Sequence, residues 1–391
     1  MTGEDLRYLC DRLKPFGGAS VFAEMSALAV RTGAINLGQG FPDVDGPTAV
    51  SEAAVDAIRG GFNQYPPGIG HPVLRHAVAE HQQRFWGLEF DPDSEVLITA
   101  GATEAITASL LALTGPGDEV VTFEPYFDIY PADIALAGAT RRLVQLHPPD
   151  YSFDPDELAA AFGSRTRVLL LNSPHNPTGK VFTAEELDVI ARLCVQHDVI
   201  AVTDEVYEHL TFDHNVHVPI ATRPGMAERT VTISSAGKTL SFTGWKIGWV
   251  CASPLLVKAV QAAKQLLTFV NGGPFQPAVA VGLGLGDEYF SDLAADLQAR
   301  RDLLCDGLSA AGFKVAVPQG TYFVIADVSG FGETDGLEFC RSLPGRCGVV
   351  AVPVEVLCDD KAFGSPLVRF AACKRPEVLE QAVERLASLT P

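Results

Sequence analysis

The sequence offers little for disulfide or metal chemistry. Its 391 residues include eight cysteines, but they form no C-x-x-C pair, and no Cys/His cluster has the spacing of zinc ligands. Scattered cysteines are typical of free thiols in a reducing compartment. We therefore expect no metal site and a cytoplasmic location.

Targeting and membrane signals are also missing. The N-terminal stretch MTGEDLRYLCDRLKPF is charged and lacks the apolar segment of a secretory signal. The longest apolar stretch, residues 97–114, contains Glu104 and several threonines. This composition favours a strand, a turn and a helix over a membrane span, so we expect no membrane partner.

The chain has no excess of positive charge. It carries 48 acidic and 29 basic residues, which gives a formal net charge of −19. Nucleic acids and anionic membranes repel such a chain, so we expect neither as a partner. Hydrophobic residues make up 47% of the sequence, which is enough for a substantial core and argues against disorder.

The chain shows no internal repeat but a regular alternation of apolar runs and helical patterns. From about residue 95 the runs are EVLITAG, EVVTFEP, RVLLLNSP, VIAVTDEVY, RTVTISS and KIGWVCAS. Runs that are apolar on both faces indicate buried strands of a mostly parallel sheet. Helical patterns lie between several of them, and one begins with a capping-box signature at Thr183 and Glu186. This alternation predicts an α/β fold with helices on both faces of the sheet.

The pattern changes after about residue 286. A long helical pattern is followed by the short strands GTYFVIADV, CGVVAVP and LVRFAAC and by a final helix, PEVLEQAVERLASL. We expect a large domain over residues 46–285, and a smaller α+β domain built from residues 1–45 and 286–391. The glycine-rich GLGLG at 282–286 follows a helical pattern rather than a strand, so it does not predict a dinucleotide site.

Two predicted strand ends favour contacts to an anion and to a ring. In open α/β sheets, ligands bind beyond the carboxyl ends of the strands. Gly101, Ala102 and Thr103, in TAGATEA, are small residues at the start of a helix, where free backbone N–H groups attract anions. Asn176, in NSPHNPTG, lies between two prolines that hold its amide at a fixed angle. For each feature alone, an ordinary turn is the better explanation.

Two further strand ends carry opposite charges. Asp204 ends the run VTD and is either a helix cap or the partner of a buried cation. Lys238 follows the small residues SSAG, and Lys246 follows eight positions later. A buried ammonium is costly unless it is paired or neutralised. Together the four strand ends favour one ligand with a phosphate, a ring nitrogen, a ring hydroxyl and an aldehyde, and pyridoxal 5′-phosphate has all four.

A series of motifs carries a family resemblance along nearly the whole chain. Their order is NLGQGFPD, NQYPPGIGHPVLR, GATEA, EPYFDIY, NSPHNPTGKVF, TDEVYEHL, SSAGKTLSFTGWKIGW, QGTYF and VRF. The chain resembles the class I aminotransferases of pyridoxal-phosphate fold type I, and within them the kynurenine, glutamine and methionine aminotransferases. VFAEMSALA and PFQPAVA are also similar to actinobacterial N-succinyldiaminopimelate aminotransferases. The resemblance implies a mostly parallel seven-stranded sheet between helices and a smaller α+β domain.

The resemblance also implies roles for single residues in holding the cofactor. Lys238 stands at the position of the Schiff-base lysine, and Lys246 at a position where many relatives bind the cofactor phosphate with arginine. Asp204 matches the acid that pairs with the pyridinium nitrogen. The other implied cofactor contacts are Asn176 and Tyr207 to the ring hydroxyl, Phe127 on the ring face, Ala102 and Thr103 at the phosphate, Ser235, and Tyr65, which reaches the phosphate from the partner subunit of a homodimer.

The implied reaction is transfer of an amino group between an L-amino acid and a 2-oxo acid by a ping-pong mechanism. Lys238, Asp204 and Tyr207 are the implied catalytic residues. The implied substrate contacts are Arg369 to the carboxylate, the Gly40 backbone, Phe22 and Asn176. This reading explains both lysines, because Lys238 is neutralised on the cofactor while Lys246 is paired with a phosphate.

The residues expected around the substrate's side chain do not identify a single amino donor. Asn271, Gly272 and Gly273 are small where kynurenine-type relatives carry bulkier residues, and Thr103 replaces an aromatic residue of some relatives. This suggests a roomier or more polar pocket. N-succinyl-diaminopimelate, methionine, glutamine and an aromatic amino acid all stay possible donors. A cysteine-conjugate β-lyase would use the same lysine and acid. A non-catalytic regulatory protein is less favoured, because Lys238, Asp204 and Arg369 are all present.

Overall fold

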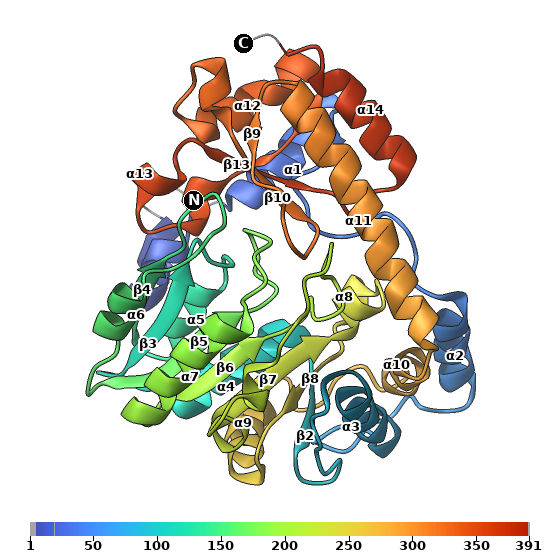
Figure 1. Ribbon diagram of the computed structural model, residues 1–391. Helices are drawn as coiled ribbons and strands as arrows, with labels where there is room; N and C mark the ends of the chain where they lie inside the picture. The colour runs from blue at the N-terminus through green and yellow to red at the C-terminus, as the bar shows by residue number, and fades with distance from the viewer. Residues whose placement is uncertain (1–4, 19, 390–391) are drawn as a thin grey trace.

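A seven-stranded sheet forms the lower half of the molecule in the view of Figure 1. The computed structural model describes residues 5–18 and 20–389. The strand order is β2-β8-β7-β6-β5-β3-β4. Strand β8 is antiparallel to both neighbours, and the other pairs are parallel, which confirms the predicted fold class. The strands are β2 (Val96–Thr99), β3 (Glu119–Glu124), β4 (Thr140–Gln145), β5 (Thr166–Asn172), β6 (Ile200–Asp204), β7 (Thr230–Ser235) and β8 (Gly248–Cys251).

The apolar runs predict every strand of this sheet except β4. That strand lies at the edge of the sheet, next to β3 only, and its first four residues alternate between exposed and partly buried positions, while Val144 is buried. It carries Arg141 and Arg142 on consecutive positions. An edge strand keeps polar residues in contact with water, so it lacks the continuous apolar run of the central strands.

Helices cover both faces of the sheet because its strands are apolar on both sides. In β5, Val168 and Leu170 pack with the cluster that includes helices α4 and α9, while Leu169 and Leu171 pack with the cluster that includes α6 and α7. This is the two-residue period of a strand. The helices are α4 (Gly101–Leu113), α5 (Tyr130–Leu136), α6 (Pro155–Ala161), α7 (Ala184–His197), α8 (Ala236–Thr239) and α9 (Pro254–Leu267).

Two predictions about helix ends are confirmed. Helix α7 begins with a capping box in which the Thr183 hydroxyl accepts from the Glu186 N–H and the Glu186 carboxylate accepts from the Thr183 N–H. The GLGLG segment covers the end of α10 (Phe275–Leu283), so it follows a helix and not a strand. Helix α10 packs beside α2 (Thr48–Arg59) and contacts α3 (Pro72–Trp86) (Figure 1).

A second layer of strands lies above the large sheet in Figure 1. Its four-stranded antiparallel sheet has the order β12-β13-β10-β9, and β1 pairs in parallel with β11. The strands are β1 (Ile35–Asn36), β9 (Lys314–Val315), β10 (Phe323–Asp327), β11 (Val349–Val350), β12 (Val352–Pro353) and β13 (Leu367–Ala371). The accompanying helices are α1 (Val21–Thr32), α11 (Asp287–Ala310), α12 (Gly336–Cys347), α13 (Lys361–Gly364) and α14 (Pro376–Leu386).

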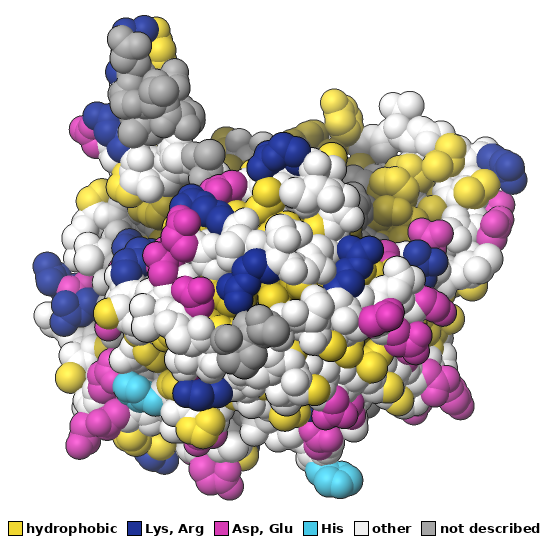
Figure 2. Space-filling model, turned by 90° about the horizontal axis from the view of Figure 1, so that it is seen from above, with side chains coloured by type: hydrophobic (Ala, Val, Ile, Leu, Met, Phe, Trp, Pro, Cys, Tyr) yellow, Lys and Arg dark blue, Asp and Glu magenta, His cyan; other side chains and the backbone are white. Residues whose placement is uncertain are grey.

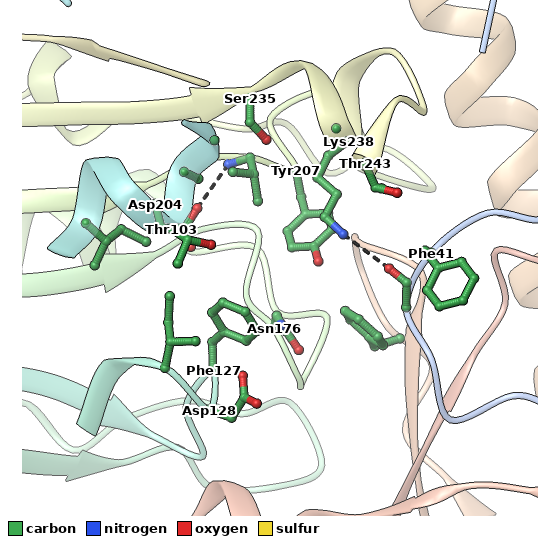
Figure 3. Close-up of a pocket in the computed structure, with 18 of the residues that line it drawn as sticks. Phe41, Thr103, Phe127, Asp128, Asn176, Asp204, Tyr207, Ser235, Lys238 and Thr243 are labelled. Atoms are coloured by element: carbon green, nitrogen blue, oxygen red, sulfur yellow. Dashed lines mark hydrogen bonds between the residues drawn. The ribbon is translucent and has the colours of Figure 1, made fainter. Parts of the chain in front are cut away.

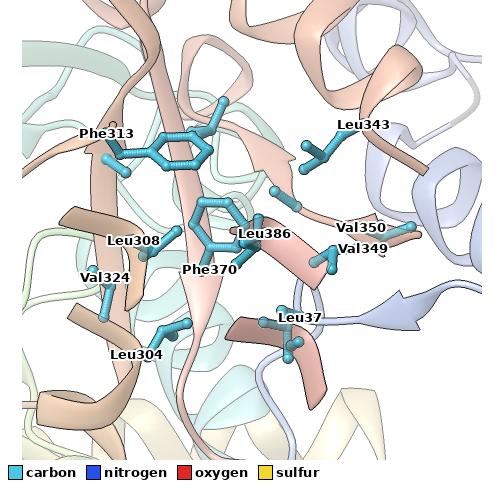
Figure 4. Close-up of a cluster of buried hydrophobic side chains, with 14 of the residues drawn as sticks. Leu37, Leu304, Leu308, Phe313, Val324, Leu343, Val349, Val350, Phe370 and Leu386 are labelled. Carbon is cyan, nitrogen blue, oxygen red and sulfur yellow. The ribbon is translucent and has the colours of Figure 1, made fainter. Parts of the chain in front are cut away.

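The N-terminal and C-terminal parts of the chain share one apolar core. Figure 4 shows Leu37 in the same cluster as Phe313, Phe370 and Leu386, and Met25 of α1 is also part of it. Helix α11 extends from this upper layer towards the large sheet (Figure 1). The domain limits at residues 45 and 285 stay a prediction. The short 3-10 helices are Asp5–Tyr8, Asp11–Phe16, Ile220–Thr222, Ala227–Arg229, Thr243–Trp245, Val328–Phe331 and Val354–Leu357.

The surface and the helices add two observations. On the face shown in Figure 2, lysine and arginine side chains are interspersed with aspartate and glutamate. Within residues 5–18 and 20–389, no helix combines the length and the apolar character that a membrane crossing requires.

Candidate active site

A pocket of about 450 Å³ lies between the carboxyl ends of the large sheet's strands and the upper layer (Figure 3). In Figure 3, Lys238 points into it from one side, with Phe127 and Asp128 on the opposite side. Of the predicted site residues, only Tyr65 is absent from its lining. Those that line it are Phe22, Gly40, Ala102, Thr103, Phe127, Asn176, Asp204, Tyr207, Ser235, Lys238, Lys246 and Arg369.

One end of the pocket, formed by the start of α4 together with Thr103 and Lys246, is suited to bind an anion, and we call it the anion cradle. Helix α4 starts at Gly101, which has a positive φ of 73°, and the first N–H groups of a helix have no partner within it. The Lys246 Nζ lies 3.4 Å from the Thr103 hydroxyl oxygen at the same helix start. A Cβ on Gly248 of β8 would lie 2.8 Å from the Ala102 nitrogen. Glycine is therefore needed for β8 to approach the helix start this closely.

Asp204 lies buried at the end of β6 with a well-defined set of partners. Its Oδ2 accepts a hydrogen bond of 2.7 Å from the buried Tyr130 hydroxyl. Its backbone oxygen accepts from the Asn172 amide, whose own oxygen accepts from the Asn176 N–H. Burial raises the Asp204 pKa to about 6, against the opposing effect of the Tyr130 hydrogen bond. A cationic ring nitrogen beside this carboxylate would offset that cost.

Lys238 enters the pocket from the short helix α8. Its Nζ donates hydrogen bonds to the Tyr322 hydroxyl at 2.5 Å and to the Gly40 carbonyl at 3.2 Å. Burial lowers its pKa to about 8, because the charged ammonium loses solvation. The lowered pKa makes the neutral amine, the form that acts as a nucleophile or a base, easier to reach than for an exposed lysine.

Arg369 of β13 is a buried residue of the pocket lining. Its guanidinium donates to the Asn176 side-chain oxygen at 3.1 Å and to the Gly38 carbonyl at 3.2 Å, and it stacks over Phe323. Its Nε is buried and has no hydrogen-bond partner among the described residues. Burial lowers the Arg369 pKa to about 10. A buried guanidinium with an unused donor suits a ligand carboxylate.

Tyr65 differs from the other predicted site residues in its position. Its side chain is 82% exposed and makes an edge-on contact with Phe269, which is 50% exposed. The single chain therefore leaves Tyr65 outside the pocket. Its proposed contact with the phosphate of a partner subunit stays a prediction.

The structure gives another reason for the small residues at 271–273. The Asn271 amide donates to the Thr99 and Lys246 carbonyls of its own chain. A Cβ on Gly273 would lie 2.9 Å from the Phe62 carbonyl oxygen. These residues therefore hold neighbouring backbone segments close together next to the anion cradle. None of them lines the pocket of the single chain.

Sequence reasoning missed three polar residues at the site. Tyr130 and Asp128 belong to the EPYFDIY motif and Tyr322 to QGTYF, but their partners are distant in sequence, as with Tyr322 and Lys238, which are 84 positions apart. Asp128 lines the pocket, and burial raises its pKa. Only their membership in the motifs could have indicated these residues.

A buried polar cluster lies next to the segment that carries Asp204 and Tyr207. The ligand atoms of His81, Glu208 and His209 lie within 4.8 Å of one another, which is close enough for a metal ion. However, the two histidine Nε2 atoms are hydrogen-bonded at 2.8 Å, and Glu208 accepts from the Trp86 indole and the Ser234 hydroxyl. These bonds occupy the two Nε2 atoms and both Glu208 carboxylate oxygens, and they connect the segment after β6 to α3 and β7.

Comparison with known proteins supports the family resemblance. Residues 32–386 match the model of the family described as aminotransferase class I and II. A probable N-succinyldiaminopimelate aminotransferase of Mycobacterium tuberculosis is 51% identical over 388 residues, which cover 97% of this chain and 98% of the relative. The methionine aminotransferase of Escherichia coli is 38% identical over 95% of this chain and 96% of its own. The mouse kynurenine–oxoglutarate transaminase 3 is 38% identical over 94% of this chain and 87% of its own.

Solved structures agree with these matches. The structure of N-succinyldiaminopimelate aminotransferase from Mycobacterium tuberculosis has a TM-score of 0.95 and covers 98% of this chain and 100% of that chain. A structure of an Escherichia coli protein with a methionine aminotransferase function has a TM-score of 0.93, at 38% identity, and covers 97% and 99% of the two chains. The chain belongs to the class I and II aminotransferase family.

Proposed function

We propose that this aminotransferase holds pyridoxal 5′-phosphate in the pocket and transfers amino groups between an L-amino acid and a 2-oxo acid. The observation that carries the proposal is that two basic side chains, the partly buried Lys238 and the buried Arg369, line one pocket. Lys238 has a pKa lowered towards neutrality, and Arg369 has a buried Nε without a partner. One is suited to react with a carbonyl, and the other is suited to hold a carboxylate.

The residues present fit this cofactor. The start of α4, Lys246 and Thr103 would hold the phosphate, with Ser235 and the partner's Tyr65 as further contacts. Asp204 would face the ring nitrogen, Phe127 the ring face, and Asn176 and Tyr207 the ring hydroxyl. The cofactor supplies an aldehyde that takes up amines and a protonated ring that accepts electrons from the substrate.

The chain's own residues would then carry out positioning and proton transfer. Arg369 grips the substrate carboxylate through two N–H groups and so fixes the direction of the Cα–H bond. Lys238 Nζ takes the proton from Cα and delivers it to the carbon that carried the cofactor's aldehyde, so that hydrolysis can release the 2-oxo acid. Asp204 keeps a proton on the ring nitrogen, because its buried carboxylate is stabilised by a neighbouring cation.

We propose N-succinyl-diaminopimelate as the amino donor, with a role in amino-acid biosynthesis. The named activity of the relative at 51% identity supports this choice. So does the lining of the pocket, which combines the polar Asp128 and Gln39 with the apolar Phe22 and Ile106. A long donor with an apolar stem and polar ends would find both kinds of contact there.

We further propose that the active unit is a cytoplasmic homodimer whose two sites share residues. The exposed Tyr65 and Phe269 support this, because they form an aromatic pair that the single chain does not cover. A two-fold interface would place each pair against the neighbouring subunit twice.

A panel of amino donors tests the proposed function. The cofactor-loaded enzyme is mixed with N-succinyl-diaminopimelate, methionine, glutamine, kynurenine or a cysteine conjugate, each with several 2-oxo acids. We expect a new amino acid from the acceptor, and the highest kcat/KM with N-succinyl-diaminopimelate. Higher kcat/KM with another donor would overturn the substrate. Release of ammonia and pyruvate from the cysteine conjugate, without transfer, would identify a β-lyase instead.

A further inference from the structure

Tyr322, Gly40 and Lys238 form a closed triangle of hydrogen bonds. The Tyr322 hydroxyl donates to the Gly40 carbonyl at 2.6 Å. The Lys238 Nζ donates to the Tyr322 hydroxyl at 2.5 Å and to the same Gly40 carbonyl at 3.2 Å. In Figure 3 the dashed line from Lys238 marks the bond to Gly40. The family resemblance implies no role for Tyr322, which belongs to the QGTYF motif.

One assignment of donors and acceptors satisfies all three of these bonds. A tyrosine hydroxyl has one hydrogen, and here Gly40 receives it, so Tyr322 presents only lone pairs to Lys238. A neutral lysine amine has two N–H donors and one lone pair. Both donors are used, one on Tyr322 and one on Gly40. The lone pair therefore has no partner among the residues that the structure describes, and the amine lines the pocket.

The Tyr322 ring is held firmly enough to fix such a geometry. It is 2% exposed and lies directly before β10. Its ring packs edge-on against Tyr207, with centroids 5.4 Å apart, and its backbone oxygen accepts from the Ala372 N–H. A lysine side chain has many rotamers, so an anchored acceptor removes much of its freedom.

We propose that Tyr322 is a positioning residue for proton transfer by Lys238, because it orients the amine together with the Gly40 carbonyl. This inference rests on the proposed function. As a base, Lys238 uses its lone pair to take the substrate's Cα proton, and the C–H electron pair stays with the substrate. The nitrogen then has three N–H bonds. Two still point at Tyr322 and Gly40, so the third, which carries the substrate's proton, stays directed into the pocket, where it can be delivered to the carbon that carried the cofactor's aldehyde.

The variant Tyr322→Phe removes only the hydroxyl oxygen from this triangle. We expect kcat to fall about 10- to 100-fold, as for loss of one hydrogen bond to a charged group, while KM and cofactor content change less than about threefold. The primary kinetic isotope effect with α-deuterated substrate should rise, because proton transfer becomes slower than the other steps. Tyr289→Phe is the matched control. Its hydroxyl donates to the Thr239 carbonyl beside the same short helix but does not contact Lys238.

A second measurement avoids turnover altogether. The pKa of Lys238 is determined in cofactor-free protein from the pH dependence of its labelling by an amine reagent, read by peptide mass spectrometry. In Tyr322→Phe this pKa should fall, because the ammonium loses an acceptor. An unchanged labelling profile together with an unchanged isotope effect would overturn the proposal, as would equal effects in Tyr289→Phe. If the cofactor is never attached to Lys238 in wild-type protein, the proposed function fails, whatever Tyr322 does.

Discussion

At the scale of single residues, burial sets the chemistry of the pocket. Asp204 and Arg369 are buried and Lys238 is partly buried, and loss of solvation shifts the pKa of each towards its neutral form. Such groups cost stability in the empty protein and regain favourable interactions only with a ligand. Activity and stability should therefore respond in opposite directions when one of these charges is removed.

We expect Asp204→Asn to stabilise the cofactor-free protein and to abolish turnover. The Asp204 pKa is raised from 3.8 to about 6, so its neutral form favours folding at low pH, and this contribution is lost as the pH rises through 6. The amide avoids that loss. Urea unfolding should show an advantage of about 3 kcal/mol for the variant at pH 8, which shrinks towards pH 4. If the variant and the wild-type protein were equally stable at both pH values, the claim that a charged Asp204 destabilises the cofactor-free protein would be wrong. Near-normal turnover would show that Asp204 is only a helix cap.

We expect Lys246→Ala to weaken cofactor retention but to leave the covalent attachment site in place. Lys246 lies at the start of α4 beside Thr103, where it would pair with a phosphate. Loss of a charge-assisted hydrogen bond should raise the cofactor Kd about 10- to 100-fold, measured by equilibrium dialysis. Lys258→Ala, which removes an exposed lysine from α9, is the control. Equal retention in the two variants would remove Lys246 from the phosphate site.

Sequence reasoning at this scale reached the residues that belong to recognisable motifs. Lys238 and Asp204 follow small or apolar strand residues, and the structure places both at one pocket. It could not reach the Tyr130 bond to Asp204 or the Tyr322 bond to Lys238. These bonds depend on the folded positions of distant segments, and a hydroxyl in a sequence carries no sign of which partner it will meet.

At the scale of elements, the close approach of β8 to the start of α4 shapes the anion cradle. We expect Gly248→Ala to destabilise the protein by about 1–3 kcal/mol and to weaken cofactor retention. The added Cβ would lie 2.5 Å from the Gly101 carbonyl carbon and 2.8 Å from the Ala102 nitrogen. These are backbone atoms, so they cannot relieve the clash by a change of rotamer. Thermal unfolding and dialysis measure both effects. Gly163→Ala, where a Cβ meets nothing within 4 Å, should change neither. Wild-type behaviour of Gly248→Ala would contradict the tight approach.

The elements themselves were predictable where one environment acts along a whole segment. The central strands are buried on both faces, so their sequences are continuous apolar runs. The edge strand β4 is partly exposed and has no such run, so it was the one strand of this sheet that was not predicted. The helices α2 and α3 were also not predicted. The region before residue 95 shows no strand–helix alternation, and the packing of α2 and α3 on α10 comes from a distant part of the chain.

At the scale of the whole molecule, the account requires two subunits. We expect Tyr65→Ala and Lys238→Ala to be inactive alone but to regain about a quarter of wild-type activity after mixing and subunit exchange. About half of the dimers are then mixed, and each has one site with both lesions and one with neither. A substitution of Asn271 could not replace Tyr65→Ala in this test, because the Asn271 amide donates hydrogen bonds to backbone carbonyls of its own chain. No recovery after proven exchange would show that Tyr65 serves its own subunit.

The most direct test of the central claim locates the cofactor on the chain. Protein loaded with pyridoxal 5′-phosphate is reduced with borohydride, digested, and its peptides are mapped by mass spectrometry. The account predicts the pyridoxyl mass on Lys238 and on no other lysine, and its loss in Lys238→Ala. A pyridoxyl group on Lys246, or a chain without any adduct, would contradict it.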